Sequence, residues 1–436
     1  MKKNARAAAL YALERCRKSG AWSGAAIDGA VRDFELDGRD AALTARLTLG
    51  VLQNGSYLDY YIDLYAKRGL ESGLRELLRL GAFQLLFLDK IPAHAAVSET
   101  VSLCRSRGFD RAAGLCNAVL RRIAENKDAL PPIPGEGSAD YLAIRRSHPL
   151  WLTERLCREQ GYAFAEAFLR ENNEPAPLTI QVNRLRIEPE DYEHALQRSG
   201  VPFRAFPGLP GCLELEGGRV IELPGYEEGL FYVQDRAARI AAEAAGVKPG
   251  MHVLDACAAP GGKSFATAIA AEGRGDFTAC DIHEKKLRLI REGAERLGIG
   301  CIRTEARDAR RFDPDFEGAF DAVLADVPCS GLGVIRKRPE IRRKTEEEIR
   351  ELPEIQAAIL DNLARYVKPG GVLLYSTCTV LQAENREQIL RFLARHSDYR
   401  SEDFAVGGLR SEEGCYEFWP QTDGTDGFFA AKLRRK

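Results

Sequence analysis

The sequence lacks the features that would set it apart from ordinary globular proteins. Its 62 basic and 64 acidic residues give a formal charge of -2, so no overall field favours or opposes nucleic acid. The 11 cysteines include no Cys-x-x-Cys pair and no cluster with histidine at zinc spacing, which argues against structural zinc and a disulfide framework. We therefore expect free thiols, no metal and a cytoplasmic protein.

An uninterrupted apolar stretch of membrane length is also missing. The most hydrophobic stretch, residues 77–88, is short and contains Arg79 and Gln84, so it predicts a buried helix. Residues 1–6 lead into a mixed charged and apolar helix without the apolar core of a signal peptide. We expect no membrane partner.

Proline is absent before Pro92, and apolar residues recur there at helical spacing. Residues 131–138 then combine three prolines with two glycines, which cannot continue a helix. We predict an all-α domain over 1–130, a small α/β (ferredoxin-like) module with its linker over 131–230, and a third domain over 231–436. Within the middle region the pattern predicts helices at 151–169 and 191–198 and strands at 178–183, 212–215 and 220–223.

Beyond residue 230, apolar strands alternate with helices. The predicted strands are 252–256, 277–281, 302–305, 322–326 and 372–377, and helices begin near 264, 284 and 383. This alternation is typical of an α/β fold with a doubly wound parallel sheet. The carboxyl ends of such strands meet at one edge and form a ligand crevice.

The first of these strands runs into a glycine turn of small residues. Small side chains let the backbone approach a ligand, and the following helix presents free amides. The spacing fits neither the dinucleotide nor the phosphate-loop fingerprint. Asp281, at the end of the second strand, is placed for ribose hydroxyls, and Asp308 for an adenine amino group. Together these features favour S-adenosyl-L-methionine, the alternative being a tight turn with two helix-capping aspartates.

Two further strand ends carry cysteines. Cys329 lies three residues after Asp326, and Cys378 follows Ser376 and Thr377. A thiolate is suited to add to C6 of a pyrimidine, which makes C5 nucleophilic enough to accept a methyl group. Asp326 is placed to bond the cytosine ring edge. Either cysteine alone also fits a buried, inert thiol, and the residues do not order the two roles.

Four motifs resemble those of the RNA cytosine-C5 methyltransferases, and within them the bacterial RsmB (Sun/Fmu) branch, which modifies a specific cytosine of 16S small-subunit ribosomal RNA. They lie at residues 257–263, 326–331, 376–378 and 426–433. The resemblance implies a Rossmann-like methyltransferase domain and, through residues 91–99 and 117–122, a NusB-like RNA-binding domain at the N-terminus.

The same resemblance implies the roles of individual residues. Cys378 is the implied nucleophile and Cys329 assists elimination, while Asp326 and Lys263 complete the catalytic set. The implied contacts of the methyl donor are Cys257, Ala258, Ala259, Pro260, Gly261, Gly262, Lys263, Asp281, Asp308 and Asp326.

The expected partner is RNA, bound by a monomer. Residues 1–130 hold 20 Lys/Arg and 15 Asp/Glu, a surplus of about five positive charges. Candidate phosphate contacts there are Arg105, Arg107, Arg111, Arg121 and Arg122. The basic stretch 336–344 follows the Cys329 loop and is expected at the crevice rim as a backbone clamp, the alternative being a charged loop. The target cytosine must be unpaired or flipped to reach Cys378.

Other functions stay open at this point. One alternative is methylation of another RNA, such as a transfer RNA, and a second is a non-catalytic ribosomal RNA-binding assembly factor. An amino-group methyltransferase would need no thiol, and a DNA cytosine methyltransferase would use the cysteine after proline as nucleophile.

Overall fold

The computed structural model describes residues 4–66, 69–217 and 219–436. The chain forms two compact units. Residues 1–175 and 335–346 make a helical unit, and residues 176–334 and 347–436 make an α/β unit. The three-part division predicted with boundaries near 130 and 230 stays a prediction.

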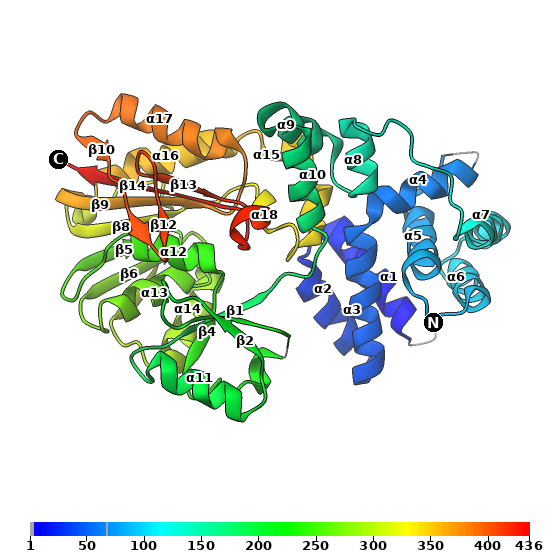
Figure 1. Ribbon diagram of the computed structural model, residues 1–436, viewed down its shortest axis with the longest axis horizontal. Coiled ribbons are helices and arrows are strands. Elements are labelled where there is room, and N and C mark those ends of the chain that lie inside the picture. Colours follow the sequence, from blue (N-terminus) through cyan, green and yellow to red (C-terminus); the bar gives the residue numbers. More distant parts are fainter. Residues whose placement is uncertain (1–3, 67–68, 218) are drawn as a thin grey trace. The chain divides into compact units, whose positions relative to one another are not determined.

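The helical unit confirms the predicted all-α N-terminal region (Figure 1). Its helices are α1 (Ala5–Ser19), α2 (Ser23–Asp33), α3 (Gly38–Gln53), α4 (Gly55–Tyr65), α5 (Ser72–Phe87), α6 (Ala93–Ser106), α7 (Ala113–Asn126), α8 (Ala139–Arg145), α9 (Leu150–Gln160) and α10 (Tyr162–Glu171). The apolar stretch near residue 80 lies in α5 and is buried, as predicted. No helix in the described part of the chain is long and apolar enough to cross a membrane.

A small sheet opens the α/β unit. Its strands are β1 (Leu178–Val182), β2 (Phe203–Ala205), β3 (Cys212–Leu215) and β4 (Phe231–Val233), in the order β2-β3-β1-β4, with helix α11 (Pro189–Arg198). All of its pairings are antiparallel. Its apolar side chains form a core of their own with Tyr192 and Leu196 of α11.

The large sheet has the order β10-β14-β9-β8-β5-β6-β7, with β13 beside β14. The strands are β5 (His252–Asp255), β6 (Asp276–Asp281), β7 (Ile302–Ala306), β8 (Phe320–Asp326), β9 (Val367–Thr377), β10 (Tyr399–Ser401), β13 (Cys415–Phe418) and β14 (Phe428–Arg435). Strands β5 to β9 are parallel, and β14 runs antiparallel to β9. A separate ribbon pairs β11 (Ala405–Val406) with β12 (Leu409–Arg410).

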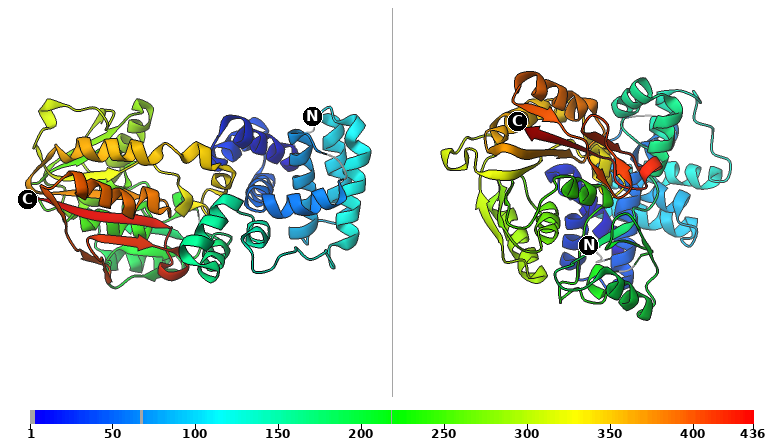
Figure 2. Two further views of the ribbon diagram at one scale, coloured as in Figure 1. Left: turned by 90° about the horizontal axis from the view of Figure 1, so that it is seen from above. Right: turned by 60° about the vertical axis from the view of Figure 1, so that its left-hand side comes forward.

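Helices cover both faces of the large sheet (Figures 1 and 2). Side chains of α12 (Arg236–Ala244), α13 (Gly262–Ala270) and α14 (Glu284–Leu297) pack in one apolar core. Those of α16 (Leu352–Ala364) and α17 (Arg386–Arg395) pack in another on the opposite face. The short helices α15 (Glu346–Ile349) and α18 (Pro420–Asp423) complete the set of described α-helices. This is the doubly wound fold that the alternation predicts.

Three predicted elements differ from the observed ones. The helix expected over 151–169 is divided between α9 and α10 by Gly161, whose φ of +85° interrupts the helical path. The strand expected over 220–223 is a short 3-10 turn. The helix expected from about residue 383 begins at Arg386, after a 3-10 turn over Gln382–Glu384.

Candidate active site

Three loops follow adjacent strands of the large sheet and end at one edge. Strand β8 lies between β5 and β9, and in register Asp326 stands opposite Ser376. The loop after β8 is also bonded to its neighbours, because the Gly333 N–H donates to the Cys378 carbonyl at 3.0 Å. The loops predicted to meet at the strand ends therefore lie together, and they include the glycine turn and both cysteine loops.

Glycine is required at two points where this crevice is built. Gly261 caps α13 with a φ of +111°, and a Cβ there would meet the Phe265 ring at 2.6 Å. Gly333 lies against Gly427, so that a Cβ would come within 1.8 Å of the Gly427 oxygen. The first glycine opens the amide end of α13, and the second lets the Cys329 loop pack against the loop before β14.

Lys263 and Asp326 form the charged centre of the crevice. The Lys263 ammonium lies 2.7 Å from Asp326 Oδ2, and Ser376 Oγ donates to Asp326 Oδ1 at 2.8 Å. Lys263 is buried, and its Nζ stands 4.8 Å from the centroid of the Phe428 ring. Both Asp326 oxygens are thus fixed, and a cation is held where the strands end.

The two cysteines meet beside this ion pair. Cys329 Sγ and Cys378 Sγ are 3.3 Å apart, and both side chains are half-buried and free of disulfides. The hydrogen bond from Cys329 lowers the pKa of the Cys378 thiol, and the Lys263 charge acts in the same direction. The bond to Cys378, followed by burial and the charges of Glu384 and Asp326, raises the pKa of Cys329. The surroundings of the two sulfurs thus favour negative charge on Cys378 over Cys329.

The residues predicted to hold the methyl donor lie around the same edge. Asp281 ends β6, is buried, and accepts the His283 N–H at 2.9 Å. Asp308 lines a cavity of about 280 Å³ beside the β7 end, and the Arg310 guanidinium lowers the pKa of its carboxyl. Burial raises the pKa of Cys257 well above that of a reactive thiol. Cys257 therefore contributes shape and not nucleophilicity.

One acid of the crevice was absent from the predicted site residues. Asp255 ends β5, and burial raises its pKa to about 7. Its Oδ2 accepts from Ser264 Oγ at 2.6 Å, whereas the buried Oδ1 has no hydrogen-bond partner. The signal for it was available, since it is an acidic residue at a strand end like Asp281 and Asp326.

A second omission is the polar layer beneath the cysteines. Gln356, Glu384 and Asn385 are buried and hydrogen-bonded to residues that flank Cys329 and Cys378. No spacing rule identifies them, because Gln356 comes from α16 and the other two from a turn that reads as the start of a helix.

The backbone clamp predicted at residues 336–344 stays a prediction. This stretch belongs to the helical unit. Arg336 has a side chain only 2% exposed and is paired with Glu171 of α10, and Arg343 is paired with the buried Glu76 of α5. Part of the charge of this stretch is therefore used in protein contacts with distant parts of the sequence, whereas Lys337 and Arg338 are exposed.

Arg342 is the centre of that packing. Its guanidinium is buried and donates to five neutral oxygens of the helical unit. They are the carbonyls of Gln53, Arg146, Ser147 and Asn172 and the side-chain oxygen of Asn173. Burial lowers the pKa of this guanidinium, and the five acceptors compensate for the lost hydration.

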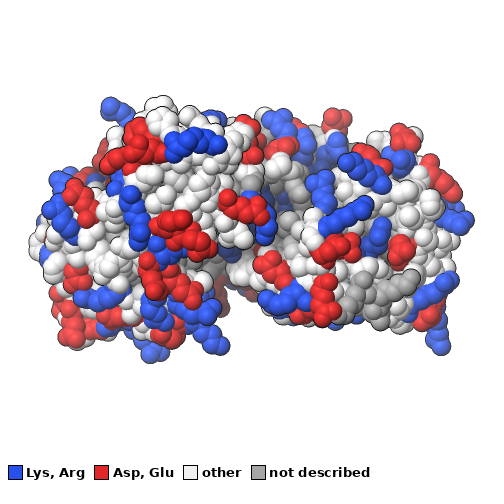
Figure 3. Space-filling model, turned by 90° about the horizontal axis from the view of Figure 1, so that it is seen from below, with Lys and Arg blue, Asp and Glu red and all other residues white. Residues whose placement is uncertain are grey.

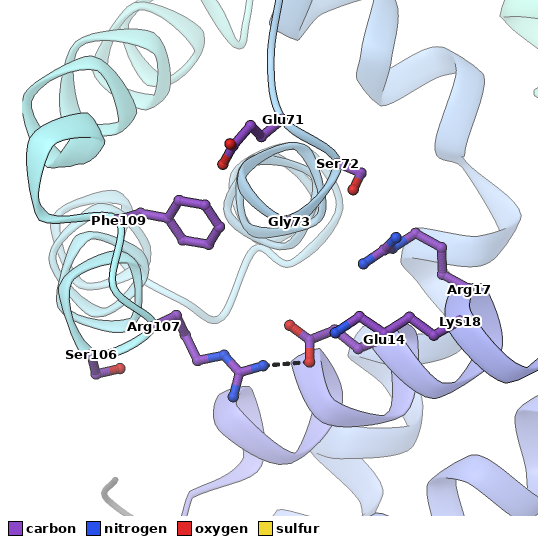
Figure 4. A pocket seen from close by; sticks show the side chains of 9 residues that line it. All are labelled: Glu14, Arg17, Lys18, Glu71, Ser72, Gly73, Ser106, Arg107 and Phe109. Carbon is purple, nitrogen blue, oxygen red and sulfur yellow. Dashed lines mark hydrogen bonds and ion pairs between the residues drawn. The ribbon is translucent and has the colours of Figure 1, made fainter.

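Four of the predicted arginine contacts, Arg105, Arg111, Arg121 and Arg122, are exposed. The fifth, Arg107, is ion-paired with Glu14 at a cavity of about 580 Å³ (Figure 4). That cavity also carries Arg17, Lys18 and Glu71, so two carboxylates offset three basic side chains. On the face in Figure 3 basic and acidic side chains are likewise interspersed. The two thiols and the Lys263–Asp326 ion pair, by contrast, all lie in the α/β unit.

Comparison with known proteins agrees with this geometry. The family model for the 16S rRNA methyltransferase RsmB/F matches residues 244–434, the NusB family matches 3–125, and the RsmF/B-like ferredoxin-like domain matches 148–222. The probable ribosomal RNA small subunit methyltransferase B of Bacillus subtilis is 33% identical over 100% of this chain and 99% of its own length. This chain belongs to the RsmB family of methyltransferases.

Two further proteins are similar to this RsmB family member over most of its length. The ribosomal RNA small subunit methyltransferase B of Erwinia tasmaniensis is 35% identical over 91% of this chain and 90% of its own. The crystal structure of PH0851 is 27% identical, with a TM-score of 0.84, and covers 100% of this chain and 99% of that one. The predicted fold class, with its NusB-like, ferredoxin-like and Rossmann-like parts, is confirmed.

Proposed function

We propose that this RsmB family member is an S-adenosyl-L-methionine-dependent enzyme that methylates C5 of a cytosine in 16S ribosomal RNA, at a target of the cytosine 967 type. The observation that carries this proposal is the pair of thiols 3.3 Å apart beside the Lys263–Asp326 ion pair. Methylation at a ring nitrogen or an exocyclic amine has no use for such a pair, whereas methylation of C5 requires a nucleophile to add first at C6.

The residues of the crevice suit the methyl donor. Bound S-adenosyl-L-methionine supplies a methyl group on a sulfonium, which departs as a neutral thioether. Asp281 offers a buried carboxylate for ribose hydroxyls, and Asp308 lies at the cavity expected for adenine. The Gly261 turn exposes backbone amides at the start of α13. The buried, unpartnered Oδ1 of Asp255 is a further acceptor at this edge.

The proposed reaction uses the two thiols in order. The Cys378 thiolate bonds to C6, the C5–C6 π electrons pass to C5, and C5 forms the bond to the methyl carbon. The C5 hydrogen then leaves as a proton, the double bond re-forms, and the Cys378–C6 bond breaks. While Cys378 is bonded to carbon it no longer holds charge next to Cys329, so Cys329 can release its own proton to solvent and then, as the thiolate, accept the proton from C5. The Asp326 carboxylate accepts a hydrogen bond from the exocyclic amino group at the ring edge, which orients the base for attack at C6.

The proposed substrate is a single-stranded or flipped cytosine, because both faces of C5–C6 must be reached. We propose the NusB-like region as an RNA-binding part, with Arg105, Arg111, Arg121 and Arg122 as exposed candidates, and a monomer without a metal. An RNA substrate and 11 free cysteines fit a reducing cytoplasm as the compartment.

The test is transfer of a labelled methyl group to 16S ribosomal RNA, with transfer RNA as the competing substrate and bisulfite mapping of the product. Cys378→Ala is expected to reduce transfer to background while calorimetric binding of S-adenosyl-L-methionine stays within a few-fold of the wild type. Cys415→Ala, at a buried cysteine on β13, is the control. RNA binding without any methyl transfer by the wild type would favour the assembly factor instead.

A further inference from the structure

One short turn before α17 is hydrogen-bonded to both cysteine loops. The 3-10 turn over Gln382–Glu384 and the residue after it place two buried side chains, Glu384 and Asn385, under the strand ends. Asn385 leaves the helical path with φ -113° and ψ -107°, so α17 starts only at the next residue. Successive side chains therefore reach different loops, and this separation is what the irregular turn achieves.

Glu384 and Gln356 bracket Cys329. The Ser330 N–H donates to Glu384 Oε2 at 2.9 Å, and Gln356 Nε2 donates to the Pro328 carbonyl at 3.0 Å and to Glu384 Oε2 at 2.8 Å. The backbone is thus fixed on both sides of the cysteine. Glu384 is 1% exposed, and its Oε1 has no hydrogen-bond partner.

Asn385 brackets Cys378 in the same way. Its Oδ1 accepts from Thr377 Oγ1 at 2.6 Å, and its Nδ2 donates to the Thr379 carbonyl at 3.0 Å. The hydroxyls of Ser330 and Thr379, each directly after a cysteine, lie 2.5 Å apart and join the two loops. Both cysteines are thus held from the two sides, but Cys329 is held by the carboxyl group of Glu384 and the amide of Gln356, and Cys378 by the single neutral amide of Asn385.

We propose that Glu384 is a positioning residue which, with Gln356, fixes the Cys329 loop and directs the proton shared by the two thiols onto Cys329. A buried negative charge beside one thiol and not the other disfavours a second negative charge there. The proton then rests on Cys329 Sγ, and Cys378 Sγ carries the charge. This inference rests on the proposed function but concerns the resting protein, so it is tested without RNA or methyl donor.

Several charged or titratable groups share this environment and must be kept constant. Those acting on the two thiols from the surrounding elements are Glu384, Asp326, Lys263, Tyr375 and Asp426. Glu384→Gln changes only one of these charges and keeps the shape of the side chain. Glu387→Gln, one turn away on the exposed side of α17, is the matched control.

The experiment follows alkylation of each cysteine in the full chain by iodoacetamide across pH, resolved by peptide mass spectrometry. In the wild type Cys378 is expected to react first at neutral pH. In Glu384→Gln the pH midpoint for Cys329 is expected to fall by about one unit, so that the Cys378:Cys329 rate ratio at pH 7 drops about ten-fold. A merely structural role would change both rates together and leave the midpoints in place.

A second variant keeps the inference testable if Glu384→Gln does not fold. Gln356→Met removes a hydrogen-bond donor from the Glu384 carboxylate, so the negative charge of Glu384 acts more strongly on Cys329. The Cys329 midpoint is then expected to rise. Midpoints equal to those of Glu387→Gln in both variants, or a shift of opposite sign in either, would overturn the inference. Loss of methyl transfer alone, with the midpoints as expected, would instead count against the proposed function.

Discussion

The loops that carry Cys329 and Cys378 are alike in origin and different in surroundings. Each follows a parallel strand, β8 or β9, and each is fixed by side chains on both sides of its cysteine. Lys263 favours negative charge on Cys378, whereas Glu384 opposes it on Cys329. Two identical side chains 3.3 Å apart can therefore take opposite roles, because the charges around them differ.

Removing the Cys329 thiol is expected to have the largest effect, and it tests whether the two cysteines have different roles. Cys329→Ala leaves the Cys378 nucleophile in place but removes the group proposed to accept the C5 proton. Turnover is expected to fall by several orders of magnitude, within the range seen when a general base is lost. RNA is expected to remain attached to the protein on denaturing gels. The control is the double variant with Cys378→Ala, which should retain no RNA, and an equal amount of retained RNA in both would reject the assigned order.

The same substitution also tests the shared proton. The hydrogen bond from Cys329 is the main cause of the lowered pKa of Cys378, so its loss should raise that pKa. A thiol reacts as the thiolate, and reactivity is lost as pH falls through its pKa. The alkylation midpoint of Cys378 is therefore expected to move to higher pH in Cys329→Ala, by about one unit or more. An unchanged midpoint would mean that the two sulfurs do not share a proton in solution.

Much of this site was predictable from the sequence. Apolar strands ending in Asp255, Asp326 and Thr377 had to meet at one edge of a parallel sheet, and that placed the glycine turn beside both cysteines. The assignment of nucleophile and assistant came from the family resemblance and stays a prediction. Local pattern carries no information on it, since the groups that distinguish the thiols come from other elements, Lys263 from α13 and Glu384 from a 3-10 turn.

The parts that were missed share one physical cause. Residues 336–344 have the composition of a solvated basic loop, and only the fold reveals that Arg342 finds its acceptors near residues 53, 146 and 172. Glu384 likewise fits the first turn of a helix in the sequence. In the structure it lies in a 3-10 turn before the irregular backbone at Asn385, and its side chain is buried. Burial of charge depends on partners distant in sequence, which neither periodicity nor composition encodes.

A smaller effect is expected at the cation beside Cys378. Lys263→Met removes the ammonium and leaves the Asp326 carboxylate uncompensated, and both changes raise the pKa of Cys378. Alkylation of Cys378 at pH 7 should slow several-fold, up to about ten-fold, and that of Cys329 should slow less, because Lys263 acts on Cys378 and Asp326 acts on both. Lys248→Met, at an exposed lysine before the opposite end of β5, serves as the control. Equal slowing of both cysteines would point to a general loss of packing.

The loops differ also in the segments to which they lead, and this gives the prediction with the smallest effect on the thiols. The chain after Cys378 enters the turn before α17, whereas the chain after Cys329 enters residues 335–346 of the helical unit, held by Arg342.

Arg342→Lys keeps the charge but not the planar guanidinium that reaches five acceptors, so buried carbonyls lose their donors. The cost is on the order of 2 kcal/mol. Scanning calorimetry should show a lower melting temperature with the Cys378:Cys329 alkylation ratio unchanged. A changed ratio would mean that the helical unit helps to set the position of Cys329, and the charge difference between the brackets would then no longer suffice to explain how the two thiols differ.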